Sequence, residues 1–257
     1  MSIRPKHHVT KDGSSTFYSN EFGQYYHNPN GSVSESEYVF FEASGLSEVI
    51  NKRSSITIFE IGFGTGLNFL LLLDYYRKMR SCANITFYSI EAFPLTFEEA
   101  KQLDFGKLSE NEDMKEILTS IFKELHSGLN IIHPFPNQNI ELRLFIGKFS
   151  EFDFSEIKSD FIFQDAFSPE VNSELWTVDA FRKMKFISSN DAVLTTYCAS
   201  SKARAAMAVA GWCLAKKRGA LGKREMTVAS ISEAKLEGLK RVNEKRLVQR
   251  FEDGDFD

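Results

Sequence analysis

One short segment, FEIGFGTGLNFL at residues 59–70, restricts the fold of this chain more than any other. The β-branched and apolar run ITIFEI leads into its first glycine, and the apolar run LNFLLLLDYY follows its last one. This order predicts a buried strand that ends at Gly62, a tight glycine turn, and a buried helix. A strand followed directly by a helix is the unit from which parallel sheets are built.

The same alternation of strand and helix patterns continues along the chain. Strands are predicted at residues 56–62, 85–93, 140–147, 160–167, 191–198, 213–219 and 225–232, the last two as a hairpin. We therefore predict an α/β fold with a mainly parallel seven-stranded sheet, helices on both faces, and a C-terminal antiparallel hairpin. Ligands of such sheets bind beyond the carboxyl ends of the strands, where the strand order reverses.

Two flanking regions lie outside this core, which we place at residues 51–232. Residues 1–50 form an N-terminal extension: its segment TFYSNEFGQYYH predicts two short strands, and a helix is expected over 34–50. Ser34 is the expected helix cap, with Glu37 three residues later. Residues 233–257 combine a basic, Leu- and Val-spaced segment, predicted as helical, with an acidic tail.

The spacing of the three glycines argues against a phosphate ligand. G-x-G-x-G differs from the dinucleotide pattern G-x-G-x-x-G, and the Lys of a P-loop does not follow. Glu60 would bring negative charge to the turn, which suits a cation better than a pyrophosphate. Glu91 ends the next strand, where a carboxylate accepts the ribose hydroxyls of an adenosine ligand. A plain strand–helix turn and a solvated Glu91 remain the alternatives.

Charge, cysteine content and apolar runs indicate which partners, metal sites and cellular location to expect. The net charge of −4 argues against a nucleic-acid partner, but the last seven residues, FEDGDFD, hold four acids, so the rest of the chain is neutral. The three cysteines are scattered, which favours neither a zinc site nor disulfides. The N-terminus has no signal-peptide pattern, and the longest apolar run is too short to span a membrane. We expect a cytoplasmic protein without a metal.

Five stretches together give a resemblance to a known family. FEIGFGTGLNFLLLL resembles the class I (Rossmann-like) methyltransferases, and SESEYVFFEASGL, IEAFPLT, QDAFSPEVNSELWT and GALGKREM narrow the resemblance. They look like the methyltransferase half of the bifunctional bacterial tRNA enzyme that makes 5-methylaminomethyl-2-thiouridine at the wobble position. The resemblance covers most of the chain and implies a stand-alone methyltransferase, with a separate flavin-dependent oxidase acting earlier in the pathway.

The resemblance implies S-adenosyl-L-methionine as cofactor and the aminomethyl group of the modified wobble uridine as acceptor. Asp165, after the strand FIFQ, would orient the acceptor amine and receive its proton. One departure concerns Lys148, since relatives often have an acid there that contacts adenine. The cofactor-binding residues implied are Glu60, Gly62, Gly64, Thr65, Gly66, Asn68, Glu91 and Asp165.

The tRNA partner implied by the resemblance requires basic and aromatic surfaces for the anticodon stem-loop. The segment KKRGALGKRE supplies Lys217, Arg218, Lys223 and Arg224, although such runs are as often plain solvated faces. Phe167 is the expected platform for the wobble base. Further candidates are Arg182, Lys183 and Lys185 for phosphates, and Phe17, Tyr18, Tyr25 and Tyr26 for stacking.

Two other functions remain open at this point. A methyltransferase for a small amine would use the same glycine turn and Asp165 but would need no basic surface. A non-catalytic module that binds adenosine nucleotides would keep the turn and have no use for Asp165. Trp176 is expected to support the loop after Asp165 rather than to contact a substrate.

Overall fold

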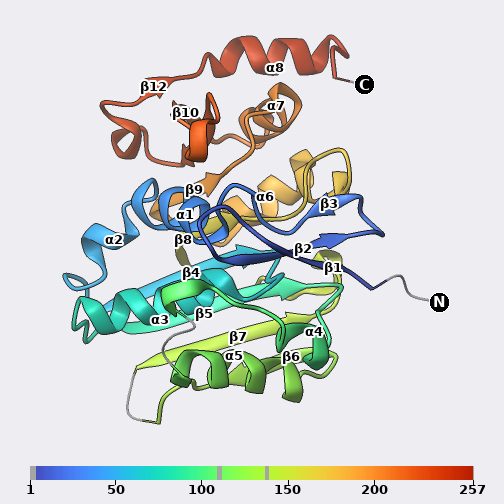
Figure 1. Ribbon diagram of the computed structural model, residues 1–257. Coiled ribbons are helices and arrows are strands. Elements are labelled where there is room, and N and C mark those ends of the chain that lie inside the picture. Colours follow the sequence, from blue (N-terminus) through green and yellow to red (C-terminus); the bar gives the residue numbers. More distant parts are fainter. Residues whose placement is uncertain (1–3, 109–111, 137–138, 257) are drawn as a thin grey trace.

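A nine-stranded β-sheet forms the centre of the computed structural model, which describes residues 4–108, 112–136 and 139–256 (Figure 1). The strand order is β12-β10-β11-β9-β8-β4-β5-β7-β6. The strands are β4 (Ser55–Ile61), β5 (Asn84–Glu91), β6 (Gly128–Ile132), β7 (Ile140–Ile146), β8 (Ser159–Gln164), β9 (Ser188–Thr196), β10 (Cys213–Lys217), β11 (Met226–Ser230) and β12 (Lys240–Arg241).

The class I fold is confirmed. Strands β7, β5, β4, β8 and β9 are parallel, and β10 and β11 form the antiparallel hairpin at one side. The sheet adds two edge strands to the seven expected: β6 pairs antiparallel with β7, and the two-residue β12 pairs with β10. Both edge strands are short, and neither has the continuous apolar pattern of a buried strand.

The alternation of side chains along each strand builds two cores, one on each face of the sheet. Ile58 of β4 and Phe87 of β5 belong to the larger core, whereas Phe59 and Ile90 belong to the other. The larger core takes the apolar side chains of helices α3 (Leu67–Lys78) and α5 (Glu112–Glu124). The second core takes those of α6 (Val178–Phe186), α7 (Ser201–Val209) and α8 (Glu244–Glu252).

Short elements complete the core region. Thr96 caps α4 (Phe97–Ala100) through a capping box with Glu99. The 3₁₀ turns are Gly106–Leu108, Phe149–Glu151, Ser173–Trp176, Ala220–Gly222 and Glu233–Leu236. No helix within the described residues is long and apolar enough to cross a membrane.

The N-terminal extension has its own three-stranded sheet, of β1 (Lys6–Val9), β2 (Ser15–Ser19) and β3 (Gln24–Tyr25). The expected pair of short strands is therefore present. The helix expected over 34–50 is instead α1 (Ser32–Ser36), a π-helical turn (Glu37–Glu42) and α2 (Leu46–Val49). Ser34 as the cap was wrong: α1 starts at Ser32 with Gly31 as its N-cap residue, and the Ser34 hydroxyl donates to Asp12 at 2.8 Å.

The C-terminal segment is also more divided than expected. A 3₁₀ turn and β12 precede α8, so the expected helix over 233–250 is confirmed only for its second part. α8 covers α7 at the end of the molecule that Figure 1 shows at the top, where Leu247 enters the second core. The boundaries of the three regions stay a prediction.

Candidate active-site cleft

A cleft of about 840 Å³ opens beyond the carboxyl ends of β4, β5, β7, β8 and β9. This is the position that the parallel topology predicted, and the volume is that of a small-molecule site. The glycine turn after β4 and the loops after β5 and β8 line the cleft. Residues Tyr18 to Glu35 of the N-terminal extension line it as well, which the sequence pattern did not indicate.

The glycine turn needs glycine for two separate reasons. Gly62, Gly64 and Gly66 have φ values of +93°, +51° and +76°, in the left-handed region where side chains cause strain. A Cβ at Gly62 would also lie 3.0 Å from the Asp165 carbonyl oxygen, and one at Gly66 would lie 2.9 Å from Leu118 Cδ1. The turn therefore packs directly against the loop after β8.

Glu91 lies where an adenosine-binding carboxylate was predicted. One carboxylate oxygen accepts the Gly64 backbone N–H at 2.8 Å, and the other accepts the Phe93 N–H at 2.8 Å. Burial raises the pKa of Glu91, although these backbone donors oppose the shift. The two bonds fix the carboxylate in the wall of the cleft, with lone pairs left for a ligand.

Asn68 connects two carboxyl groups at the centre of the site. Its Nδ2 donates to Glu60 Oε1 and to Asp165 Oδ2, each at 2.9 Å. Glu60 also receives the Ser89 hydroxyl at 2.6 Å, and its side chain does not line the cleft. Burial raises the pKa of Glu60 to about 8, so this carboxyl is largely neutral at neutral pH. The expectation that Glu60 presents negative charge to the ligand was therefore wrong, because the group lies behind Asn68.

Asp165 does line the cleft, between the glycine turn and Tyr197. Burial raises the pKa of Asp165 well above its usual value, and the neighbouring acidic group of Glu60 adds to the shift. The Tyr197 hydroxyl donates to the Ala166 carbonyl at 2.8 Å and fixes the next residue of the loop. The structure thus brings Asp165, Asn68 and Glu91 to one cavity, as the sequence predicted.

Thr65 has a different neighbour from the one expected. It is fully buried and does not line the cleft; instead, its hydroxyl shares a 2.6 Å hydrogen bond with His27 Nε2. Burial lowers the pKa of His27 to about 4, so its ring is neutral at neutral pH. His27 belongs to the N-terminal extension, and no spacing signal in the sequence connected it with the glycine turn.

The extension also holds the loop that follows Asp165. Gln24 Nε2 donates to Ser168 Oγ at 2.6 Å, and the Ser168 backbone N–H donates to Gln24 Oε1 at 3.2 Å. On the other side of the loop, Trp176 Nε1 donates to the Phe167 carbonyl at 2.8 Å. The supporting role expected for Trp176 is therefore present, whereas Gln24 was missed.

Aromatic rings form one side of the cleft. Phe167 lies 5.0 Å from both Phe22 and Tyr26, measured between ring centroids, and Phe22 lies 5.3 Å from Phe93. Phe93 is 51% exposed, which is unusual for a phenyl ring. Phe17 was wrong as a stacking candidate, because it is fully buried.

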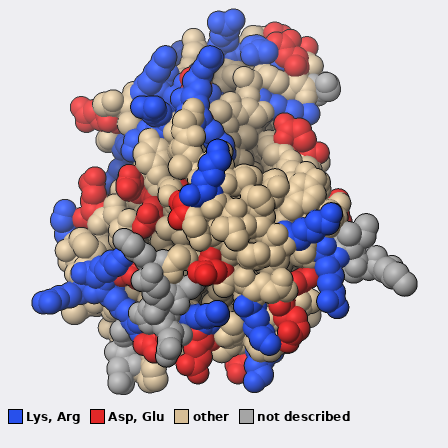
Figure 2. All heavy atoms as spheres, in the orientation of Figure 1, with Lys and Arg blue, Asp and Glu red and all other residues tan. Residues whose placement is uncertain are grey.

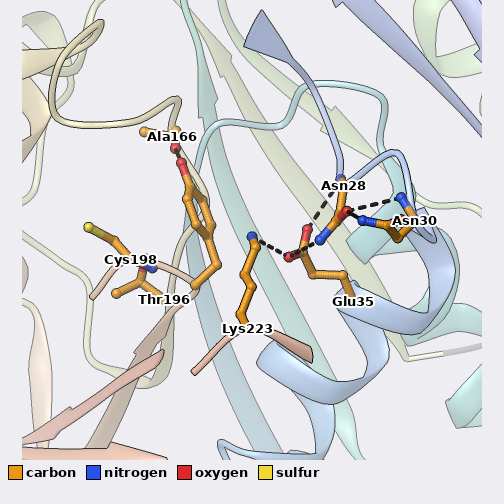
Figure 3. Close-up of polar contacts among 8 residues, drawn as sticks. Asn28, Asn30, Glu35, Ala166, Thr196, Cys198 and Lys223 are labelled. Carbon is orange, nitrogen blue, oxygen red and sulfur yellow. Dashed lines mark hydrogen bonds and ion pairs between the residues drawn. The ribbon is translucent and has the colours of Figure 1, made fainter. Parts of the chain in front are cut away.

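Among the predicted basic residues, some form contacts within the protein and others are exposed to solvent. Lys223 lines the cleft: its ammonium forms an ion pair with Glu35 at 2.7 Å and lies 5.1 Å from the Tyr197 ring centroid. Figure 3 shows Lys223 and Glu35 pointing toward each other, with Asn28 holding Glu35 from behind. Arg218 and Arg224 are exposed. Glu35 was missed, since its role depends on contact between distant segments.

The remaining basic candidates contact backbone carbonyls, an acidic side chain or aromatic rings. Lys217 Nζ lies 3.5 Å from the Ala43 carbonyl, and Lys185 Nζ donates to the Gly211 carbonyl at 2.6 Å. Arg182 pairs with Asp179 at 3.0 Å. Lys183 lies over two phenylalanine rings and lines the cleft, as does Lys148.

The chain is similar to several known proteins. The family described as S-adenosyl-L-methionine-dependent methyltransferase matches residues 109–232. The tRNA 5-methylaminomethyl-2-thiouridine biosynthesis bifunctional protein MnmC of Leptospira interrogans is 32% identical over 85% of the chain. The protein of the same name from Aromatoleum aromaticum is 32% identical over 84%. The chain spans about a third of both proteins, at 34% of their length.

A solved structure agrees with the sequence relatives. The crystal structure of MNMC2 from Aquifex aeolicus superposes with a TM-score of 0.75 at 25% sequence identity. The match covers 96% of this chain and 75% of that one. The likeness therefore extends over the N-terminal extension, the sheet and the C-terminal segment.

Proposed function

This chain belongs to the S-adenosyl-L-methionine-dependent methyltransferase family, and from that premise we propose that it methylates the aminomethyl group of the modified wobble uridine in tRNA. The product is 5-methylaminomethyl-(2-thio)uridine. The names of the MnmC relatives support the acceptor, and the cleft supports the chemistry. We further propose that a separate flavin-dependent oxidase acts before this step.

The residues of the cleft fit the proposed cofactor. Asn68 Oδ1 is buried and has no hydrogen-bond partner among the described residues, so it is available to an ammonium donor. Glu91 presents a fixed carboxylate for ribose hydroxyls, and the glycine turn lets a ligand approach the backbone closely. When bound, S-adenosylmethionine supplies an electrophilic methyl group on a sulfonium. Glu60 does not contact the cofactor in this arrangement; it holds the Asn68 side chain that does.

Asp165 is the residue that we assign to catalysis. The acceptor amine must be neutral to attack, and it loses a proton as the new N–C bond forms. Asp165 accepts a hydrogen bond from the amine, which aims its lone pair, and then takes the proton directly or through water. Its raised pKa makes the carboxylate a better proton acceptor than an ordinary aspartate.

The single observation that carries the proposal is the position of Asp165 within the cleft. Its side chain is held by Asn68, and its backbone packs against Gly62 of the glycine turn. A carboxylate fixed in this way controls the angle between amine, methyl and sulfur, and alignment is the largest part of catalysis for such a displacement. A module that merely binds adenosine would not need this arrangement.

The nucleic-acid side of the site has two parts. The rings of Phe22, Phe93 and Phe167 offer the aromatic surface that a flipped-out base requires. The exposed Arg218 and Arg224 are suited to phosphate contact. Lys217 and Lys223 would contribute after leaving their present partners.

The test is incubation with labelled S-adenosylmethionine and three acceptors: tRNA that carries the aminomethyl group, unmodified tRNA, and a small diamine. We expect label only in the first, and nucleoside analysis should place it on the wobble uridine. Transfer to the diamine at a comparable rate, or no transfer to aminomethylated tRNA, would reject the proposed acceptor.

A further inference from the structure

Positive charge is concentrated in one part of the chain. Residues 201–250 hold thirteen Lys and Arg against four Asp and Glu, whereas residues 1–200 hold eighteen against twenty-seven. The same segment builds α7, β10, β11, β12 and α8 at one edge of the sheet. Figure 2 shows Lys and Arg gathered over the upper part of the molecule, where Figure 1 places these elements.

A subset of these cations is exposed and has no acidic partner among the described residues. We call them the C-terminal basic strip: Arg218, Arg224, Lys240, Lys245 and Arg246. The strip begins in the β10–β11 loop, beside the cleft. It continues through β12, where Lys240 pairs in register with Lys216, and reaches the first turn of α8.

Two acidic groups of this region are paired with cations outside the strip. Glu225 is paired with Arg204 at 2.9 Å and with Lys216 at 3.0 Å. Asp255 of the acidic tail folds back onto Arg250 at 2.7 Å. The strip therefore keeps its charge, and cations that are not paired within the protein attract a polyanion.

Aromatic residues distinguish the strip from the cleft. Residues 201–252 contain two aromatic residues, Trp212 and Phe251, and both pack into the second core, Trp212 at 2% exposure. Single-stranded nucleic acid is bound by stacking its bases on aromatic rings. A double-stranded RNA stem keeps its bases stacked and is recognised mostly through its backbone. The strip has the chemistry for a stem, whereas the aromatic cleft has the chemistry for an unstacked base.

We propose that the C-terminal basic strip binds the sugar–phosphate backbone of an RNA stem while the adjoining loop places its base in the cleft. This inference rests on the proposed tRNA substrate and extends the contact surface to β12 and α8, beyond the β10–β11 loop. Its consequence is that binding of the stem and binding of the loop depend on different residues.

The experiment uses the triple variant Lys240→Glu/Lys245→Glu/Arg246→Glu. The matched control Lys52→Glu/Lys115→Glu/Lys123→Glu makes the same change in charge at exposed positions outside the C-terminal segment. Binding of an anticodon stem-loop and of a single-stranded RNA with the loop sequence alone is measured over a range of salt concentrations. Circular dichroism and cofactor binding confirm that both variants are folded.

We expect the triple variant to bind the stem-loop on the order of tenfold more weakly and to reduce its salt slope by about two to three. Binding of the loop RNA should stay unchanged, as should stem-loop binding by the control beyond a small general effect. An unchanged salt slope, or an equal loss for both RNAs, would overturn the inference. A wild-type chain that binds the stem-loop but methylates no tRNA would instead reject the proposed function.

Discussion

Asn68 donates a hydrogen bond to Asp165 at 2.9 Å, and the same Nδ2 donates to Glu60 at the same distance. One amide thus sets the position of the carboxyl group that lines the cleft and connects it to a carboxyl group buried behind the cleft. The Asn68 bond also opposes the effect of burial, because it favours the ionised form of Asp165.

Asn68→Ala should therefore slow methyl transfer at neutral pH by roughly 10- to 100-fold. With the donor removed, the pKa of Asp165 rises further, so the acidic limb of the rate profile should move to higher pH. The measurement is the pH dependence of kcat, with Asn20→Ala as a control that removes a half-buried, hydrogen-bonded amide outside the cleft. A fall in rate that is equal at every pH would contradict this explanation.

Asp165→Asn should nearly abolish methyl transfer while it leaves cofactor affinity within a few-fold. The substitution keeps the size of the side chain but removes the proton acceptor. Single-turnover transfer and cofactor binding are measured on the same preparation. Activity within about tenfold of the wild type would remove Asp165 from the catalytic role.

Glu60→Gln should change how the free energy of unfolding depends on pH. The folded-state pKa of Glu60, about 8, lies above its ordinary value of 4.5, so its ionisation favours the unfolded state. Its contribution to stability is complete below pH 4.5 and is lost as the pH rises toward 8, at up to roughly 1.4 kcal/mol per pH unit. Urea unfolding at pH 5 and pH 8 should show that Glu60→Gln gains on the wild type at the higher pH. A constant difference would show that the pKa of Glu60 is not raised.

Gly62→Ala and Gly45→Ala separate backbone strain from close packing. Both glycines have a positive φ, +93° and +82°, but a Cβ at Gly45 has no atom of a described residue within 4 Å. We expect Gly45→Ala to cost about 1 kcal/mol of unfolding free energy through strain alone. Gly62→Ala should cost about 2–4 kcal/mol, because its methyl group also meets the Asp165 backbone. Equal losses would mean that this contact relaxes without cost.

Glu35→Gln should strengthen tRNA binding although it removes an ion pair. The substitution frees Lys223, whose side chain is 43% exposed, to contact a phosphate, and it removes a negative charge beside the RNA. The dissociation constant should fall a few-fold and the salt slope should rise by about one. Glu42→Gln, at an exposed carboxylate, is the control. The loss of stability should exceed that for an exposed ion pair, because Glu35 is buried and also accepts two hydrogen bonds from Asn28.

The sequence predicts the central strands well, because each parallel strand is buried on both faces and forms a continuous apolar run. The positions of the glycine turn, Glu91 and Asp165 could be predicted equally well, because all three follow strands whose carboxyl ends meet at one edge of the sheet. The contributions of Gln24, His27 and Glu35 to the site could not be predicted from the sequence. Each acts on a loop far away in the sequence, and their short polar segments have no periodicity that indicates a partner.

Two errors have a common physical cause. Ser34 has the residue type of a cap and Glu60 that of a ligand, but neither side chain does what its type suggests. Asp12, in the loop between β1 and β2, accepts a hydrogen bond from the Ser34 hydroxyl. Asn68 lies between Glu60 and the cleft. A local motif specifies which groups are available, while tertiary contacts decide which of them reach the ligand.

The separation of charge along the chain gives the protein an electric dipole. Residues 1–200 carry an excess of nine negative charges and residues 201–257, with the acidic tail included, an excess of five positive ones, so the net charge of −4 conceals two opposed poles. In the field of a polyanion such a molecule experiences a torque as well as a force. The positive pole turns toward the polyanion before contact, and the negative pole disfavours approach from the opposite side. A protein of negative net charge can therefore associate with a polyanion quickly and in one preferred orientation.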